Sequence, residues 1–255
     1  MINLFDITPV EQYEDYFVKR DDLFCIAGVR GGKARTCWEL SQGANGLVTS
    51  GSRQSPQANI VAHIANKLNI PCHVHTPLGK LSPELISAQA VGAEIIQHKA
   101  GYNNVIIARA REDALKLGWR EIPFGMECSE AIHQTEKQVI NIPSNINRII
   151  IPVGSGMSLA GLLNELIIYN LEHIHVLGIQ VGADPIKRLN KYAPIGWQTQ
   201  CQIIKSDLDY HTKSEECYID KNKSVLLDPI YEAKCLPFIQ LNDLLWIVGI
   251  RQTIS

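Results

Sequence analysis

The sequence predicts an α/β fold in which parallel sheets are covered by helices. Two observations lead to this prediction. Short apolar segments rich in β-branched residues alternate with longer segments whose apolar residues recur at helical spacing. The short segments are also too continuously apolar to have a solvated face, which is typical of parallel strands buried on both sides.

The alternation covers most of the chain. Strands are expected at 46–50, 71–77, 93–98, 147–156 and 173–182, and helices at 56–70, 83–92, 103–118 and 158–171. In the first of these helices Ile60, Ile64 and Leu68 form an i, i+4 apolar stripe. Residues 187–223 are rich in charge and weakly periodic, so we expect a surface excursion there.

Composition limits the classes of partner. The 255 residues suffice for one large domain or two lobes. With a net charge of −2, the chain has no electrostatic footprint for nucleic acid or an anionic membrane. No apolar run approaches the roughly 20 residues of a membrane span, and the N-terminus lacks the features of a secretory signal. We therefore expect a cytoplasmic protein with a small-molecule partner; its assembly stays open, with a homodimer as one option.

The cysteines and histidines give no metal signal. The seven cysteines are scattered and include no Cys-x-x-Cys pair, so reduced thiols are expected rather than structural zinc or disulfides. His73 and His75 lie in an apolar strand, where buried, hydrogen-bonded histidines are more common than ligands. No metal is implied.

A lysine follows a glycine pair where a loop is expected to become a helix, in "VRGGKARTCWEL" (29–40). A helix N-terminus carries partial positive charge, which disfavours a cation and suits a lysine that is used neutral. A neutral lysine amine is a nucleophile for a carbonyl compound such as pyridoxal phosphate (PLP). Lys33 is thus a candidate Schiff-base lysine, the alternative being an ordinary solvated lysine after a flexible turn.

A second loop is suited to phosphate. In "IIIPVGSGMSLAG" (149–161) an apolar strand leads through small residues into a helix. Backbone N–H groups of such a loop converge on an anion, helped by the dipole of the following helix. The candidate phosphate-binding residues are Gly154, Ser155, Gly156, Met157 and Ser158. The alternative is a tight turn with Ser158 as the helix N-cap.

With these residues in hand, the chain resembles the tryptophan-synthase-β-like (fold type II) family of PLP enzymes, nearest the branch of 1-aminocyclopropane-1-carboxylate deaminase and D-cysteine desulfhydrase. The resemblance runs from about Val18 to Val248. Four segments carry it in the family's order: "VKRDDLF" with "RGGKAR" (18–24, 30–35), "SGSRQSPQAN" (50–59), "PVGSGMSLAGL" (152–162) and "LDPIYEAKC" (227–235).

The resemblance implies a role for each segment. Lys33 would carry the cofactor, Ser55 and Gln57 would hold the substrate carboxylate, and the 154–158 loop would hold the phosphate. Glu232 would pair with the pyridine nitrogen, and Tyr231 would be an active-site phenol. Plain helix capping is the alternative for Ser55 and Gln57, a hydroxyl bound to a backbone carbonyl for Tyr231, and a solvated helix-start carboxylate for Glu232.

The resemblance also implies an architecture and a reaction. The expected fold is two-lobed, with a large PLP-binding lobe (1–35 and 126–255), a small lobe (36–125) and the active site between them. The expected activity is that of a PLP-dependent lyase or deaminase acting on a small amino acid through an external aldimine and a Cα carbanion.

Two departures from the family pattern leave alternatives open. Gly32 stands where the family has an asparagine directly before the lysine. Pro56 stands where the family's carboxylate loop has a second asparagine, directly after its serine. Proline lacks an N–H, so the loop loses a donor. One alternative is PLP-dependent decarboxylation, or another conversion, of an amino-acid group carried on a larger molecule. The other is a non-catalytic binding protein with this fold, since the chain is also shorter than typical deaminases of the branch.

Overall fold

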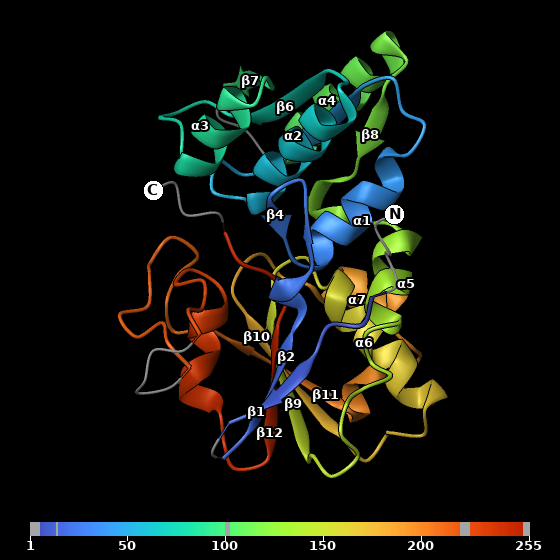
Figure 1. The fold of residues 1–255 in the computed structure, drawn as a ribbon, viewed down its shortest axis with the longest axis vertical. Helices are drawn as coiled ribbons and strands as arrows, with labels where there is room; N and C mark the ends of the chain where they lie inside the picture. Colours follow the sequence, from blue (N-terminus) through green and yellow to red (C-terminus); the bar gives the residue numbers. More distant parts are fainter. Residues whose placement is uncertain (1–5, 14, 100–102, 220–224, 252–255) are drawn as a thin grey trace. The chain divides into compact units, whose positions relative to one another are not determined.

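The computed structural model describes residues 6–13, 15–99, 103–219 and 225–251. These residues form two compact units (Figure 1). The first unit comprises the described residues of 24–130 together with 251, and the second those of 6–23 and 131–250. The sequence-based division differs mainly in residues 24–35, which it assigned to the larger lobe and which here group with the first unit.

The first unit is built on a four-stranded parallel sheet. Its strands, in spatial order, are β7 (Glu94–His98), β6 (Cys72–Pro77), β5 (Leu47–Ser50) and β8 (Arg120–Ile122). Its helices are α1 (Gly32–Ser41), α2 (Pro56–Leu68), α3 (Pro83–Ala90), α4 (Asn103–Leu117) and the 3₁₀ helix η2 (Phe124–Met126). A short hairpin, β3 (Cys25–Ile26) with β4 (Val29–Arg30), precedes α1.

The second unit is built on a six-stranded sheet. Its strands, in spatial order, are β1 (Val10–Gln12), β2 (Phe17–Arg20), β12 (Asp243–Ile247), β9 (Arg148–Val153), β10 (His175–Gln180) and β11 (Cys201–Lys205). Only β1 pairs antiparallel. Its helices are most of α5 (Ser129–Glu136), then α6 (Met157–Ile168), α7 (Ile186–Tyr192) and the 3₁₀ helices η1 (Asp21–Leu23), η3 (Trp197–Thr199) and η4 (Glu232–Phe238).

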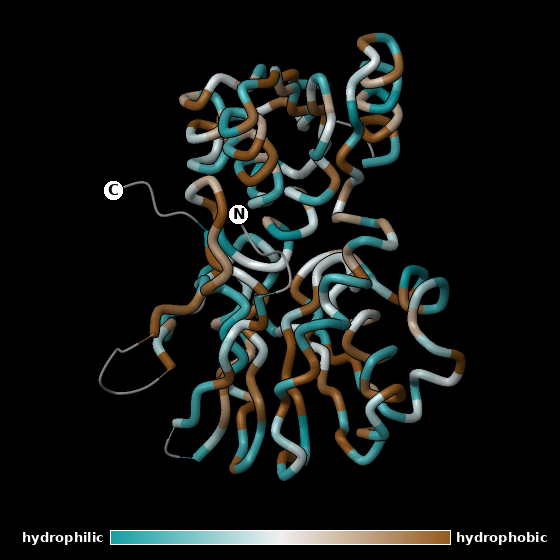
Figure 2. Tube along the Cα trace, turned by 45° about the vertical axis from the view of Figure 1, so that its right-hand side comes forward, coloured by the Kyte–Doolittle hydropathy of each residue, from teal (hydrophilic) through white to brown (hydrophobic). Residues whose placement is uncertain are grey.

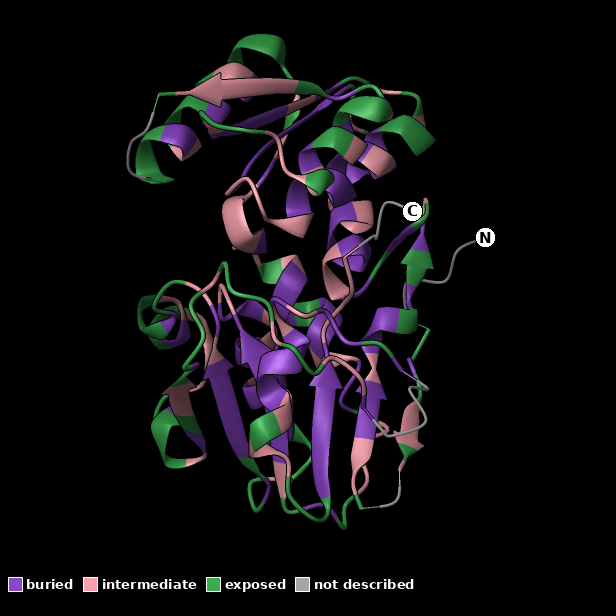
Figure 3. Cartoon of the chain, turned by 90° about the vertical axis from the view of Figure 1, so that its left-hand side faces the viewer, coloured by how far each residue is buried: buried purple, intermediate pink, exposed green. Residues whose placement is uncertain are grey.

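The core of the second unit lies on both faces of this sheet. Strand β12 is buried throughout, and β9 is buried apart from its first residue (Figure 3). The apolar residues concentrate along the strands (Figure 2). Because successive side chains alternate in direction, Leu177 and Ile179 pack with Ala233 and Cys235 of η4 on one face. Gly178 faces the other way, so a Cβ there would lie 3.3 Å from Leu159 of α6. The central strands are therefore covered on both sides.

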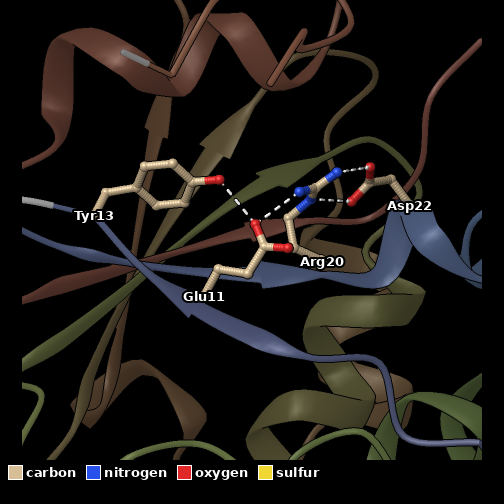
Figure 4. A network of polar contacts seen from close by, with 4 residues as sticks. All are labelled: Glu11, Tyr13, Arg20 and Asp22. Carbon is tan, nitrogen blue, oxygen red and sulfur yellow. Dashed lines mark hydrogen bonds and ion pairs between the residues drawn. The ribbon is translucent and has the colours of Figure 1, made fainter. Parts of the chain in front are cut away.

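A polar network fixes the chain as it leaves β2 (Figure 4). Arg20 donates to both carboxylate oxygens of Asp22, at 3.0 and 2.9 Å, and to Glu11 at 2.7 Å. Tyr13 donates to the same Glu11 oxygen at 2.8 Å. Burial by itself would lower the pKa of Arg20, but its hydrogen bonds to Asp22 and Glu11 raise the pKa overall. The fork-to-fork pairing with Asp22 holds η1 against the end of β2.

The structure confirms the α/β fold and every strand and helix that the alternation predicted, with ends shifted by a few residues. The predicted surface excursion at 187–223 is wrong in part. It contains β11, which pairs parallel with β10, and the buried Leu189, Trp197 and Cys201. All seven cysteines are free thiols. No helix in the described ranges combines the length and apolarity that a membrane span requires.

Candidate functional site

Lys33 is the second residue of α1, so the predicted passage from loop to helix is confirmed. Gly31 is the N-cap, with φ 96° and ψ 177°, a conformation that favours glycine. No side chain caps this helix, and its first turn holds no acidic residue. The half-buried Lys33 therefore lies at a helix start where neither a carboxylate of the first turn nor a capping side chain offsets the dipole.

The β3–β4 hairpin sets the position of this helix start. Its two-residue turn has positive φ at both Ala27 (52°) and Gly28 (80°), the pattern of a tight hairpin turn. The Gly31 N–H donates to the Phe24 carbonyl at 2.9 Å and closes the hairpin. The fully buried Arg35 guanidinium lies 4.4 Å from the centre of the Phe24 ring, which packs α1 onto the same segment.

The 50–59 segment runs from β5 into α2. Ser55 is the N-cap of α2, and its Oγ accepts from the Gln57 N–H at 3.3 Å. Pro56 occupies the first helical position, where its fixed φ suits the helix but no N–H is present. Ser55 is therefore a helix cap, as the alternative interpretation predicted. Two of the first three helix positions consequently offer no N–H to a substrate carboxylate.

Gln57 is buried, with 1% of its surface exposed. Its Nε2 donates to the Thr49 Oγ1 at 3.0 Å and to the Pro123 carbonyl at 2.8 Å. Both amide hydrogens are thus used to join α2, β5 and the chain after β8. Gln57 positions the loop, and direct binding of a substrate by its side chain stays a prediction.

The predicted phosphate loop lies at the carboxyl end of β9. Gly156 is the N-cap of α6, with φ 87° in the left-handed region, and no side chain caps the helix. The alternative that Ser158 is the N-cap is therefore wrong, because Ser158 is already the second helical residue. Ser155 and Ser158 are both half-buried. The first amides of α6 have no intrahelical acceptor, which makes this end of the helix suited to an anion.

Tyr231 lies against this loop. A Cβ built on Gly154 would collide with the Tyr231 hydroxyl and lie 3.3 Å from two of its ring carbons. Only a glycine at position 154 lets the phenol approach so closely. The structure thus brings together two predicted site residues separated by more than seventy positions in the sequence.

Glu232 is the first residue of η4 and is 1% exposed. The alternative of a solvated helix-start carboxylate is therefore wrong. The turn before it is held by Asp228, whose Oδ1 accepts from the Ile230 N–H at 2.9 Å and whose carbonyl accepts from the Tyr231 N–H at 3.1 Å. Burial, and then the charge of Glu232, raise the pKa of the Cys235 thiol. A carboxylate buried to this extent costs free energy unless donors or a cation compensate it.

Sequence reasoning missed Gly182, which follows β10. A Cβ on Gly182 would lie 3.7 Å from the Gly154 Cα, so the two glycines are close neighbours. A signal was present, because the carboxyl ends of adjacent parallel strands meet at one edge of a sheet and are a common place for ligands in open α/β folds. Strands β9 and β10 are such neighbours.

Comparison with known proteins gives one curated relative, and no family model matches the chain. The relative is an O-seryl-dTMP PLP-dependent decarboxylase of Salmonella phage ViI, 27% identical over 207 residues, which cover 66% of this chain and 48% of that protein. The chain thus spans about half the length of the curated relative it matches.

Solved structures match over nearly the whole chain. An ACC deaminase homologue superposes with a TM-score of 0.80 at 21% identity, covering 97% of this chain and 91% of that one. An O-acetylserine-dependent cystathionine β-synthase of Helicobacter pylori gives a TM-score of 0.68 at 14% identity, covering 98% and 94%. The chain therefore has the fold of the type II PLP enzymes, which confirms the fold that the sequence resemblance implied.

The approach of Tyr231 to Gly154 predicts a stability effect. Gly154→Ala sets a methyl group against the Tyr231 hydroxyl, and we expect it to lower the free energy of unfolding by about 1–3 kcal/mol. In the Tyr231→Phe background the clashing oxygen is gone, so most of this loss should disappear. Urea unfolding of the unsubstituted chain, the two single variants and the double variant measures the coupling between the two positions. Ser155→Ala, at the neighbouring position, is the control and should have little effect. An equal loss from Gly154→Ala in both backgrounds would contradict the contact.

Proposed function

We propose that the chain is a PLP-dependent enzyme that acts at the Cα of an amino-acid group. The observation that carries the proposal is the edge of the six-stranded sheet at the end of β9. A glycine loop there leads into an α6 start without a side-chain cap, Tyr231 packs on the loop, and the next residue, Glu232, is a buried carboxylate. The fold shared with the type II PLP enzymes supports this proposal.

Each unit, taken by itself, carries groups that suit part of PLP. The loop from Gly154 to Ser158 offers backbone donors and two hydroxyls to a phosphate, and Gly154 leaves no Cβ in the space that the Tyr231 hydroxyl takes. Lys33 would supply the amine that attaches the cofactor covalently. Glu232 supplies a buried anion as the partner of a protonated ring nitrogen.

When bound, PLP draws electron density away from the substrate's Cα. Lys33 would hold the cofactor and would deliver a proton to that carbon after CO₂ leaves, or remove one from it in an elimination. Glu232 would keep the ring nitrogen protonated, because an opposite charge nearby favours the charged form. Tyr231, which packs beside the phosphate loop, would be a phenol next to the bound cofactor, and Ser55 offers the hydroxyl hydrogen that capping does not use.

The reaction we propose is decarboxylation of an amino-acid group carried on a larger molecule. The start of α2 offers a substrate carboxylate fewer donors than an open helix start, because Pro56 has no N–H and Ser55 takes that of Gln57. A carboxylate with few hydrogen bonds loses CO₂ more readily than one that is well solvated, since the departing group gives up less stabilisation. The phage decarboxylase, whose name specifies a seryl group on a nucleotide, supports the same choice.

A second candidate is elimination or deamination of a small free amino acid. The fold likeness to an ACC deaminase homologue favours it. The buried Glu232 does not separate the two candidates, since loss of CO₂ and loss of the Cα proton both leave negative charge at Cα that a protonated ring stabilises.

One assay separates these reactions. The full chain, supplied with PLP, is incubated with O-seryl-dTMP labelled at the seryl carboxyl carbon and, separately, with free amino acids of both configurations. We expect labelled CO₂ and an amine product from the nucleotide. Ammonia and a keto acid from a free amino acid, with no labelled CO₂, would favour the second candidate. A chain that binds PLP but converts neither class would contradict both. Lys33→Ala is the inactive control.

Glu232 gives a further prediction. Glu232→Gln keeps the size of the side chain but removes the anion, so PLP should still bind through Lys33 and the 154–158 loop. We expect turnover to fall by a factor of order 10², about 3 kcal/mol of barrier. Steady-state kinetics measure the loss, while PLP content and the melting temperature report whether the variant folds and binds cofactor. Turnover at the unsubstituted rate would remove Glu232 from the mechanism.

A further inference from the structure

A cluster of imidazole and carboxylate groups lies in the first unit, on residues that the proposed function does not use. His73 and His75 are two positions apart on β6, so their side chains lie on the same face of the sheet. Asp113 of α4 reaches this face and is close to both rings. His75 is 3% exposed, and the side chains of His73 and Asp113 are 18% and 22% exposed.

The potential ligand atoms converge. The Asp113 Oδ2 lies 2.6 Å from the His73 Nδ1 and 3.1 Å from the His75 Nε2. One nitrogen of each ring and one carboxylate oxygen all lie within 4.8 Å of one another. The Asp113 Oδ2 thus accepts hydrogen bonds from both imidazoles. The N–H protons of His73 Nδ1 and His75 Nε2 both point at this one oxygen.

The opposite nitrogen of each ring already lies against a hydrogen-bonding group of β7. The His73 Nε2 lies 3.3 Å from the Glu94 Oε2. The His75 Nδ1 lies 2.8 Å from the His98 Nε2, and these two rings stack with centroids 5.0 Å apart. Strands β6 and β7 are paired neighbours, so the sheet itself holds these outer partners in place.

Outer partners of this kind are what metal-ligating histidines require. A histidine that binds a metal through one nitrogen donates the N–H of the other to a carboxylate or a similar acceptor. If the proton of His73 moves to Nε2, it meets the Glu94 carboxylate. If that of His75 moves to Nδ1, it meets the His98 Nε2, which accepts it when His98 carries its own proton on Nδ1. The two nitrogens facing Asp113 are then lone pairs directed at one point.

We propose that His73, His75 and Asp113 form a binding site for a divalent transition-metal ion of the zinc class. Two imidazoles and one carboxylate are ligands that suit Zn²⁺ and its neighbours in the first transition row. The ion takes the place of the two shared protons. Because Zn–N and Zn–O bonds of about 2.0–2.2 Å hold ligand atoms roughly 3.3 Å apart, the Asp113 carboxylate moves back from His73 as the ion enters.

The ion would link β6 to α4 across positions 38 residues apart in the sequence. The site does not depend on the proposed function. It adjoins the segment that leads to Ser55, however, because the His75 carbonyl accepts from the Gly51 N–H at 3.1 Å. No sequence spacing marks this site, since Asp113 lies far from His73 and His75 along the chain.

The test is a Zn²⁺ titration of the metal-free full chain against a competing chelator. We expect one equivalent to bind and the melting temperature to rise with it. His73→Gln and Asp113→Asn should each weaken binding at least tenfold. Glu94→Gln, at a side chain 68% exposed and outside the ligand set, should weaken it about tenfold by loosening His73.

His133→Gln is the matched control. His133 also pairs with a carboxylate, Glu136 at 3.1 Å, but its side chain is 68% exposed and it belongs to no metal-type cluster of the described residues. This variant should bind Zn²⁺ as the unsubstituted chain does. Unchanged binding in both His73→Gln and Asp113→Asn would overturn the site, as would Co²⁺ absorption bands typical of thiolate ligands. So would the absence of any Zn²⁺ binding.

Discussion

The close approach of the Tyr231 phenol to Gly154 is the constraint on which the second unit's candidate site depends. A side chain at position 154 would occupy the space of the Tyr231 hydroxyl. Because Gly154 directly follows β9 and Tyr231 directly precedes η4, this one contact ties the carboxyl end of a central strand to the 3₁₀ helix that begins with Glu232. The loop, the phenol and the buried carboxylate therefore belong to one packed arrangement.

The fold could be predicted where local pattern and tertiary structure agree. The predicted strands and helices between 46 and 118 and between 147 and 182 follow each other with short connections, and the structure contains each of them. Between 119 and 146 none was predicted, although β8 and α5 lie there. Strand β12 was missed, although all five of its residues are buried. It follows an irregular segment and pairs with β2, which lies more than two hundred residues earlier, so no nearby alternation marks it. Strand β11 was missed because its edge position leaves charged and polar residues exposed.

The site shows a different limit of sequence reasoning. Residues that bind anions are the same types that cap helices, so Ser55 and Ser158 each had two interpretations. The structure makes Ser55 a cap and Ser158 an ordinary helical residue. Burial resolved a third case, since Glu232 has the sequence pattern of a helix start but lies almost wholly inside the protein. The histidines of β6 were expected to be hydrogen-bonded, and they are; their convergence on Asp113 is visible only in three dimensions.

The proposed function depends most directly on Lys33. The surroundings of two other lysines provide a comparison. Lys19 is fully buried and donates to the Thr8 carbonyl and to Asn141, each at 2.7 Å. Lys234 is 3% exposed and donates to the Asp209 carbonyl at 2.6 Å. The half-buried Lys33 differs from both in lying at a helix start whose first turn holds no acidic residue.

The most direct measurement is therefore reduction of the PLP-loaded chain with borohydride, followed by mass-spectrometric mapping of the modified lysine. We expect one pyridoxyl group per chain, on the peptide that contains Lys33, and its loss in Lys33→Ala. Modification of another lysine, or of none after the visible absorbance of bound PLP has been verified, would contradict it.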